Sequence, residues 1–272
     1  MSRPRRSRRP PYAVCAALFL VLTGCGASGS APAPAPGSAP APGPGSSAPA
    51  PAPAGTSGAA GPGAAARGPA APTRPREIRL LGPGIRAAIP ADSLQALVVT
   101  GDSPDSSLAT AVLYTREDSM AGWQPALGPW PAHNALKGWT DEHRAGDLRT
   151  PIGVYGLTAA GGLLAAPGTA FPYEQNPLFN ISGEGFQGDS LEGSFDYVIA
   201  IDYNRTPGAS PLDPTRPLGE ERGGGIWLHV DHGGPTQGCI SLPADRMREL
   251  LRALDPAKAP VVVMGDAAAL GR

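Results

Sequence analysis

One cysteine of this chain lies among residues that could make it a nucleophile. The stretch LHVDHGGPTQGCISLP, residues 228–243, holds Cys239, His229 and His232 within a glycine-rich turn. A cysteine attacks a carbonyl as its thiolate, so it needs a general base or a positive potential nearby. Nine residues separate His229 from Cys239, and this glycine-rich interval can fold back to bring thiol and imidazole together. The pattern indicates acyl transfer through a thioester.

A helix is predicted shortly after the cysteine. In PADRMRELLRALDP an apolar stripe repeats at helical spacing, through Met247, Leu250, Leu251 and Leu254. Pro243 suits the first turn, and Asp255 with Pro256 ends the helix. A thiol just before a helix start lies in the positive end of the helix dipole, so we expect a lowered pKa for Cys239. The N–H groups of Gly238 and Cys239 could point at a developing oxyanion.

Two other roles for this cysteine stay open. A free cysteine is often a buried, small apolar residue. A zinc site is a second alternative, although its spacing matches no familiar zinc pattern; acceptable ligand types are present in His229, Asp231, His232 and Cys239. The remaining histidines, His133 and His143, are isolated among polar neighbours, and we expect them to be solvated.

The first 75 residues resemble processing and tether sequence. Residues 1–24 combine an arginine-rich start with a short apolar run, which is typical of a secretory signal peptide. The run ends in Leu-Thr-Gly before Cys25, as in a bacterial lipobox, so we predict a lipid on Cys25; an ordinary signal peptide is the alternative. Residues 25–75 are rich in Ala, Pro and Gly and cannot bury apolar surface, so we expect a disordered tether. Cys239 is then the one remaining thiol, because Cys15 leaves with the signal peptide.

Residues 76–272 are predicted to form one mainly β domain with helices, of the α+β class. Frequent Gly and Pro favour short strands, and we expect them at 94–100, 107–116, 150–158, 195–203, 226–230 and 260–265. Removing the five arginines of residues 1–11 from the 22 basic residues leaves 17 against 23 acidic residues, a net charge of −6. No basic stripe is present in that remainder, which argues against nucleic-acid binding.

The cysteine segment resembles the active-site segment of L,D-transpeptidase catalytic domains, the YkuD family, in which a strand histidine precedes a Ser/Thr-His-Gly-Cys turn. The matching residues are His229, Thr236, Gly238 and Cys239. A second stretch, AGDLRTPIGVYGLT, is similar to a strand and turn of the family through Gly146, Asp147, Arg149, Thr150, Pro151, Gly153 and Tyr155. IDYNR (201–205) is similar to a segment of actinobacterial-type members. The resemblance implies a β-sandwich or barrel with a helix after the catalytic cysteine.

The chain departs from the family pattern beside the cysteine. Gln237 stands where the common signature has a histidine, and the interval from His229 to Cys239 is shorter than usual. The resemblance implies that His229 is the general base and that a backbone carbonyl just after it orients the imidazole. Asp231 is a second candidate for that orienting role. The candidate substrate contacts are His232, Gln237 and Thr236.

Other residues of the matched stretches are expected to be structural. The glycines, threonine and proline of 146–153 are typical of a turn that starts a strand. Tyr155 and Trp227 are expected in the core or in a pocket wall. Asn204 and Arg205 could contact a substrate carboxylate, although surface exposure is the default for these residue types.

The resemblance implies action on peptidoglycan stem peptides. In this interpretation Cys239 attacks the carbonyl of the third stem residue, D-alanine leaves, and the amine of a neighbouring stem resolves the thioester into a cross-link. No metal or organic cofactor is implied. The alternatives are an L,D-carboxypeptidase or hydrolase, in which water resolves the thioester, and a catalytically silent peptidoglycan-binding lipoprotein. We expect a monomer that is anchored to the cell membrane by its lipid and faces the cell wall.

Overall fold

The structure is a computed structural model, and it describes residues 77–272. The predicted signal peptide, the predicted lipid site at Cys25 and the predicted tether lie outside the described residues. Within residues 77–272, no helix is long and apolar enough to cross a membrane.

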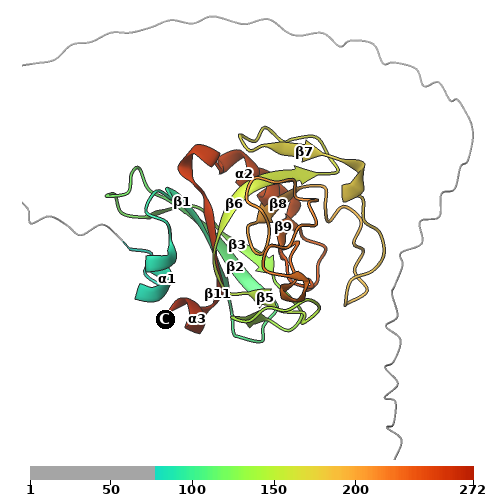
Figure 1. Ribbon diagram of the computed structural model, residues 1–272, viewed down its shortest axis with the longest axis horizontal. Helices are drawn as coiled ribbons and strands as arrows, with labels where there is room; N and C mark the ends of the chain where they lie inside the picture. The colour runs from blue at the N-terminus through green and yellow to red at the C-terminus, as the bar shows by residue number, and fades with distance from the viewer. Residues whose placement is uncertain (1–76) are drawn as a thin grey trace, which may run out of the picture. The chain divides into compact units, whose positions relative to one another are not determined.

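Eight strands close into a barrel-like sheet (Figure 1). Their order is β11-β1-β2-β3-β10-β9-β8-β6, and β6 pairs back to β11, while β7 extends the sheet beside β6. The strands of this sheet are β1 (Gln95–Gly101), β2 (Leu108–Thr115), β3 (Gln124–His133), β6 (Gly153–Gly162), β7 (Tyr173–Gln175), β8 (Val198–Ile201), β9 (Trp227–Val230), β10 (Ile240–Leu242) and β11 (Val261–Asp266). Two short strands pair separately, namely β4 (Trp139–Thr140) and β5 (Thr150–Pro151).

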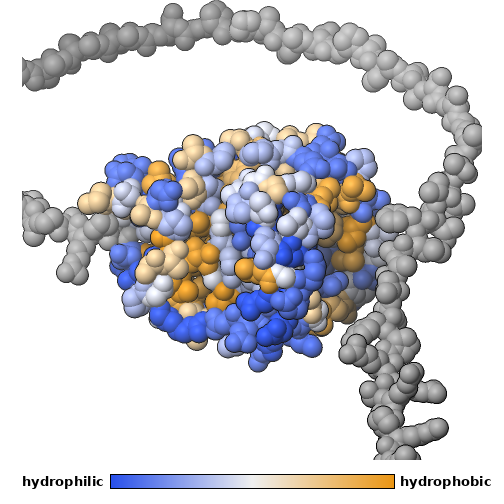
Figure 2. Space-filling view, viewed as in Figure 1, coloured by the Kyte–Doolittle hydropathy of each residue, from blue (hydrophilic) through white to orange (hydrophobic). Residues whose placement is uncertain are grey.

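The helices are few and short. They are α1 (Pro83–Ala88), α2 (Ala244–Ala253) and α3 (Ala267–Leu270), with single 3₁₀ turns at Pro177–Phe179, Glu220–Arg222 and Pro256–Lys258. The fold is therefore mainly β with a few helices, which confirms the predicted class. The surface in Figure 2 is mostly hydrophilic, with separate apolar patches.

The barrel interior and one outer face are both packed. Alternate side chains of a strand face opposite sides of the sheet. On β1, Leu97 and Val99 therefore join the interior cluster, whereas Ala96 and Val98 join a second cluster that also holds Leu270 of α3. This double burial explains why β1 reads as an almost continuous apolar run.

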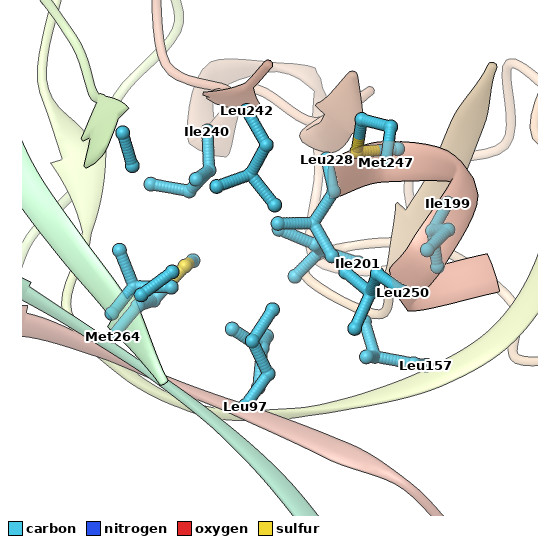
Figure 3. Packing of buried hydrophobic residues seen from close by; sticks show 14 of the residues in the cluster. Leu97, Leu157, Ile199, Ile201, Leu228, Ile240, Leu242, Met247, Leu250 and Met264 are labelled. Atoms are coloured by element: carbon cyan, nitrogen blue, oxygen red, sulfur yellow. The ribbon is translucent and has the colours of Figure 1, made fainter. Parts of the chain in front are cut away.

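The apolar stripe of α2 fills one part of the interior. Met247 and Leu250 point toward Leu228 of β9 and Ile201 of β8 (Figure 3). Helix α2 begins at Ala244, with Pro243 as its N-terminal cap residue, and its C-terminal cap residue is Leu254. The predicted helix is thus confirmed, and its burial ties the end of the cysteine segment to the core.

Four strands were not predicted, namely β3, β4, β7 and β10. Strand β10 occupies Ile240–Leu242, so a strand separates Cys239 from α2. Strand β3 contains three prolines, which lack the N–H that a ladder needs, and its pairing with β2 is irregular. Strand β7 spans only three residues. The predicted strand at 195–203 is observed only at Val198–Ile201.

Candidate active site

The cysteine segment folds as two parallel strands joined by a short turn. Ser241 of β10 lies beside His229 of β9, and Ile240 lies beside Leu228. Cys239 directly precedes β10, where its sulfur accepts the Trp227 N–H at 3.4 Å and donates to the Gly225 carbonyl at 3.7 Å. The parallel register therefore brings Cys239 and His229 to one cavity, although they come from different strands.

The imidazole of His229 is held in one orientation. Its side chain is buried, and Nδ1 donates to the Val230 carbonyl at 2.9 Å. Phe195 meets the ring edge-on, with 5.4 Å between the ring centroids. A proton on Nδ1 leaves the lone pair on Nε2, so the ring can act as a general base.

The orienting group is a backbone carbonyl, not the Asp231 carboxylate. Asp231 Oδ1 instead accepts hydrogen bonds from His133 at 2.8 Å and from Ser241 at 2.7 Å. Burial acts to raise the pKa of Asp231, but these two hydrogen bonds outweigh it and lower the pKa to about 2. The orienting role considered for Asp231 was wrong, and this carboxylate braces β10 against β3 instead.

Cys239 and His229 are both neutral in this environment. Burial raises the pKa of the Cys239 thiol to about 11. Burial also lowers the pKa of His229 to about 4, and the nearby His232 adds to that effect. The predicted lowering of the thiol pKa by the helix dipole was wrong, because β10 lies between Cys239 and α2 and desolvation dominates.

A cavity of about 300 Å³ opens over these two residues. Its second wall is a segment that lies between β7 and β8, residues 181–195, which we call the cover segment. This wall is mainly apolar, and its members in the cavity are Ile181, Glu184, Gly185, Phe186, Leu191, Ser194 and Phe195. The turn after β9 completes the lining with His232, Pro235, Thr236 and Gln237. Such a cavity suits a peptide with apolar portions and a few polar groups.

The cover segment is joined to the cysteine turn by a side-chain hydrogen bond. Asp189 accepts a short hydrogen bond from Nδ1 of His232, and both side chains are largely buried. Gly234 makes room for this contact, since a Cβ there would lie 2.7 Å from Asp189 Oδ1. The His232 ring in turn stacks on His229, with 5.7 Å between centroids and 7° between planes. His232 therefore connects the cover segment to the candidate base.

Comparison with known families gives one match. The model of the L,D-transpeptidase catalytic domain, YkuD, matches residues 105–263, which is more than half of the chain. The chain belongs to the YkuD family. No match was found among curated proteins or among solved structures.

The remaining signature residues of this YkuD domain take different positions. The Thr236 side chain is buried, and its hydroxyl donates to the Cys239 carbonyl at 2.7 Å. Gly238 packs tightly, because a Cβ would lie 2.9 Å from Ile226 Cδ1. Gln237 is exposed at the cavity rim. Thr236 thus holds the backbone at the cysteine, whereas Gln237 is free to meet a ligand.

The second family motif supports the cysteine turn from behind. Thr150 Oγ1 accepts the Ala135 N–H at 3.0 Å, and Ala135 forms a β-bridge with Thr236. Asp147 accepts the N–H groups of Arg144 and Arg149, which fixes the turn before β5. The motif is scaffold, as predicted.

Several polar residues were expected to be exposed and are buried. His143 is 4% exposed and pairs with Asp147 at 3.0 Å, and His133 is half-buried against Asp231. Asn204 is buried and donates to the Gly219 carbonyl at 2.9 Å. Arg205 is buried in an ion pair with Asp202. The predictions of solvated histidines and of an exposed Asn-Arg pair were wrong. These side chains instead make polar contacts with loop carbonyls or with aspartate carboxylates.

The structure does not support the zinc alternative. Among residues 77–272, no three His, Cys, Asp or Glu side chains are placed to hold a metal ion together. The carboxylate of Asp231 and the Nδ1 of His232 are turned toward other partners. The four residues of that alternative are therefore divided among separate contacts.

Sequence reasoning missed the cover segment. Glu184, Asp189 and Ser194 lie about 40 residues or more before the cysteine in the chain, in a stretch rich in Gly and Ser that carries no periodic signal. Only the fold brings Glu184 and Ser194 to the cavity and Asp189 to His232. The Phe and Leu residues within this polar stretch were the one available signal, since loops seldom expose apolar residues without a partner.

Proposed function

We propose that this YkuD domain is an L,D-transpeptidase that cross-links peptidoglycan stem peptides through a thioester on Cys239. The observation that carries the proposal is the placement of Cys239 and an oriented, neutral His229 on one cavity. Family membership supports a peptidoglycan substrate.

In the first half-reaction Nε2 of His229 takes the thiol proton as sulfur attacks the donor carbonyl. A carbon–sulfur bond forms, and the oxyanion meets the N–H groups of Gly238 and Cys239, for which residues 77–272 supply no other acceptor. The carbon–nitrogen bond to D-alanine then breaks, and His229 returns its proton to the leaving amine.

In the second half-reaction the amine of a neighbouring stem attacks the thioester. His229 accepts a proton from that amine, the new amide bond forms, and the carbon–sulfur bond breaks. The proton passes from His229 to the sulfur and restores the neutral pair. The Val230 carbonyl keeps the imidazole oriented through both steps and favours the transient imidazolium.

The test uses residues 26–272, in which Cys239 is the only cysteine, and the same chain with Cys239→Ala. Each is incubated with disaccharide-tetrapeptide, and mass spectrometry follows D-alanine release and dimers. We expect cysteine-dependent dimers. Release of D-alanine without dimers would instead favour the carboxypeptidase, and undiminished turnover by Cys239→Ala would remove the mechanism. A chain that binds the peptide but never acylates its thiol would be a binding module.

We also propose that the protein is a monomer held at the outer face of the cell membrane by a lipid on Cys25. The support is the lipobox-like sequence before Cys25. Mass spectrometry of the protein from a bacterial membrane fraction should find residues 1–24 removed and Cys25 diacylated. Cys25→Ser should release the protein from that fraction, and light scattering of residues 26–272 should give the mass of one chain.

A further inference from the structure

One polar group in the cavity has no partner in the free protein. Ser194 is 2% exposed, yet within residues 77–272 its Oγ makes no hydrogen bond. Its backbone is committed on both sides, because the N–H donates to the Leu191 carbonyl at 3.1 Å and the carbonyl accepts the Val230 N–H at 3.0 Å. The residue is therefore fixed against the end of β9, and only its hydroxyl is uncommitted.

Ser194 belongs to the same cavity as the candidate nucleophile and base. Ser194 lines that cavity together with His229 and Cys239, and Val230, to which it is hydrogen-bonded, directly follows His229. Two hydroxyl side chains line the cavity, and that of Thr236 is already used by the Cys239 carbonyl. Ser194 is thus the buried hydroxyl that can meet a ligand beside the candidate base.

A buried polar group without a partner is unfavourable, since it has lost its water and gained nothing in return. Such groups are rare in folded proteins and call for an explanation. A ligand that hydrogen-bonds the group removes the penalty, and a ligand that lacks the bonding group is rejected. The Ser194 hydroxyl therefore favours a bound state over the free state.

The charges around the cavity indicate which group would bind. Its lining contains no Lys or Arg among the described residues, and Glu184 would repel a carboxylate. The imidazole of His232 is already paired with Asp189. A neutral amide fits this surrounding best, because a hydroxyl can donate to its carbonyl or accept from its N–H.

We propose that Ser194 Oγ hydrogen-bonds a backbone amide of the donor stem peptide and so fixes the peptide beside Cys239. This inference rests on the proposed function for the identity of the peptide. Ser194 is a substrate-binding residue in this account, and it takes no part in proton transfer.

The test measures binding separately from turnover. Residues 26–272 with Cys239→Ala are titrated with disaccharide-tetrapeptide by calorimetry, alone and with Ser194→Ala added. We expect Ser194→Ala to weaken binding roughly ten-fold, as for the loss of one buried hydrogen bond. We also expect an unchanged or slightly raised Tm, because the variant removes an unsatisfied buried hydroxyl.

Ser93→Ala is the matched control. Ser93 is likewise fully buried with an unpartnered Oγ, but it does not line the cavity. It should leave the peptide Kd unchanged. Equal Kd values for Ser194→Ala and its parent would overturn the proposal, as would a Tm several degrees lower, which would indicate a structural role, or a parent that binds no peptide.

The two proposals can fail separately. If the wild-type chain makes no dimers and releases no D-alanine, but Ser194→Ala still weakens binding, the Ser194 site stands and the transpeptidase reaction falls. If the wild type makes dimers and Ser194→Ala binds and reacts equally well, the reaction stands and the Ser194 site falls.

Discussion

His229 lies in β9 and Cys239 directly precedes the neighbouring parallel strand β10, whereas Glu184, Asp189 and Ser194 belong to a connection between strands. On the strand side, which we call the barrel wall, His229 is buried and Cys239 is half-buried, and the strand register fixes both, with Ser241 beside His229. The cover segment is largely exposed and turns at several glycines, and Phe186 on it is 45% exposed. The two walls of the cavity thus differ in burial and in backbone regularity.

The difference suggests a division of labour. Proton transfer needs groups that hold their orientation, which the barrel wall provides through the ladder of β9 and β10. Recognition of a peptide needs polar groups in an adaptable surface, and these lie on the cover segment. If the division is correct, changes on the barrel wall should reduce kcat, whereas changes on the cover segment should act mainly on KM.

The largest effect is expected for His229→Gln. The variant keeps a polar side chain of similar size but has no base, so kcat/KM for dimer formation should fall by roughly 10²–10⁴-fold. The measurement is the initial rate of dimer formation by mass spectrometry. His232→Gln is the control on the same turn, and it should lose far less. An equal loss in both variants would contradict the assignment of His229 as the base.

The neutral state of Cys239 and His229 can be tested without substrate. With the pKa of Cys239 at about 11 through burial, alkylation by iodoacetamide should be slow at neutral pH. Its rate should rise about ten-fold per pH unit through pH 9–10, in proportion to the thiolate. A plateau already at pH 7 would instead reveal a thiolate–imidazolium pair and would contradict a neutral resting state.

The burial of His229 predicts that the stability of the fold changes with pH. His229 has a pKa of about 4 in the folded chain, so below its ordinary pKa of 6.5 the unfolded chain binds a proton that the folded chain does not. The free energy of unfolding should therefore fall by about 2 kcal/mol between pH 7 and pH 5. His229→Gln should lose this contribution in urea titrations at the two pH values. The comparison is needed because His133, whose pKa is raised by its hydrogen bond to Asp231, acts in the opposite direction.

The strand side of the cavity was largely accessible from sequence, and the cover segment was not. Alternating apolar residues predicted β9, and the helical stripe predicted α2, because both patterns follow from burial on one face. Strand β10 was missed, since ISL is too short to show a period. The hydrogen bond between Asp189 and His232 joins residues 43 apart, and nothing in the local sequence of either specifies that partner. The predicted direction of the Cys239 pKa shift was also wrong, because the desolvation of the thiol depends on the assembled fold and not on its local sequence.

A smaller effect is expected for Asp189→Asn. The amide keeps the shape but loses the charge that holds His232, so the contact between the cover segment and the cysteine turn should weaken. Amide hydrogen exchange in residues 183–191 should become roughly ten-fold faster, since local opening reports local stability. KM should rise while kcat changes little. Asp196→Asn is a control near the same segment, because the Asp196 carboxylate makes no ion pair among the described residues. A large fall in kcat in Asp189→Asn would show that the cover segment also positions the reacting groups.

The smallest effect is expected for Gln237→His, which restores the family residue at the rim. Gln237 is exposed and makes no side-chain hydrogen bond within residues 77–272, so the free energy of unfolding should stay within about 0.5 kcal/mol of wild type. Thr236 and Gly238 hold the turn on either side, and kcat should therefore change by no more than about two-fold, as for a residue outside the proton-transfer path. Any change should appear in KM, measured with two donor peptides that differ in their third residue. A many-fold rise in kcat would mean that the cavity rim takes part in catalysis. Position 237 would then belong with the residues that act on kcat and not with those that act on KM.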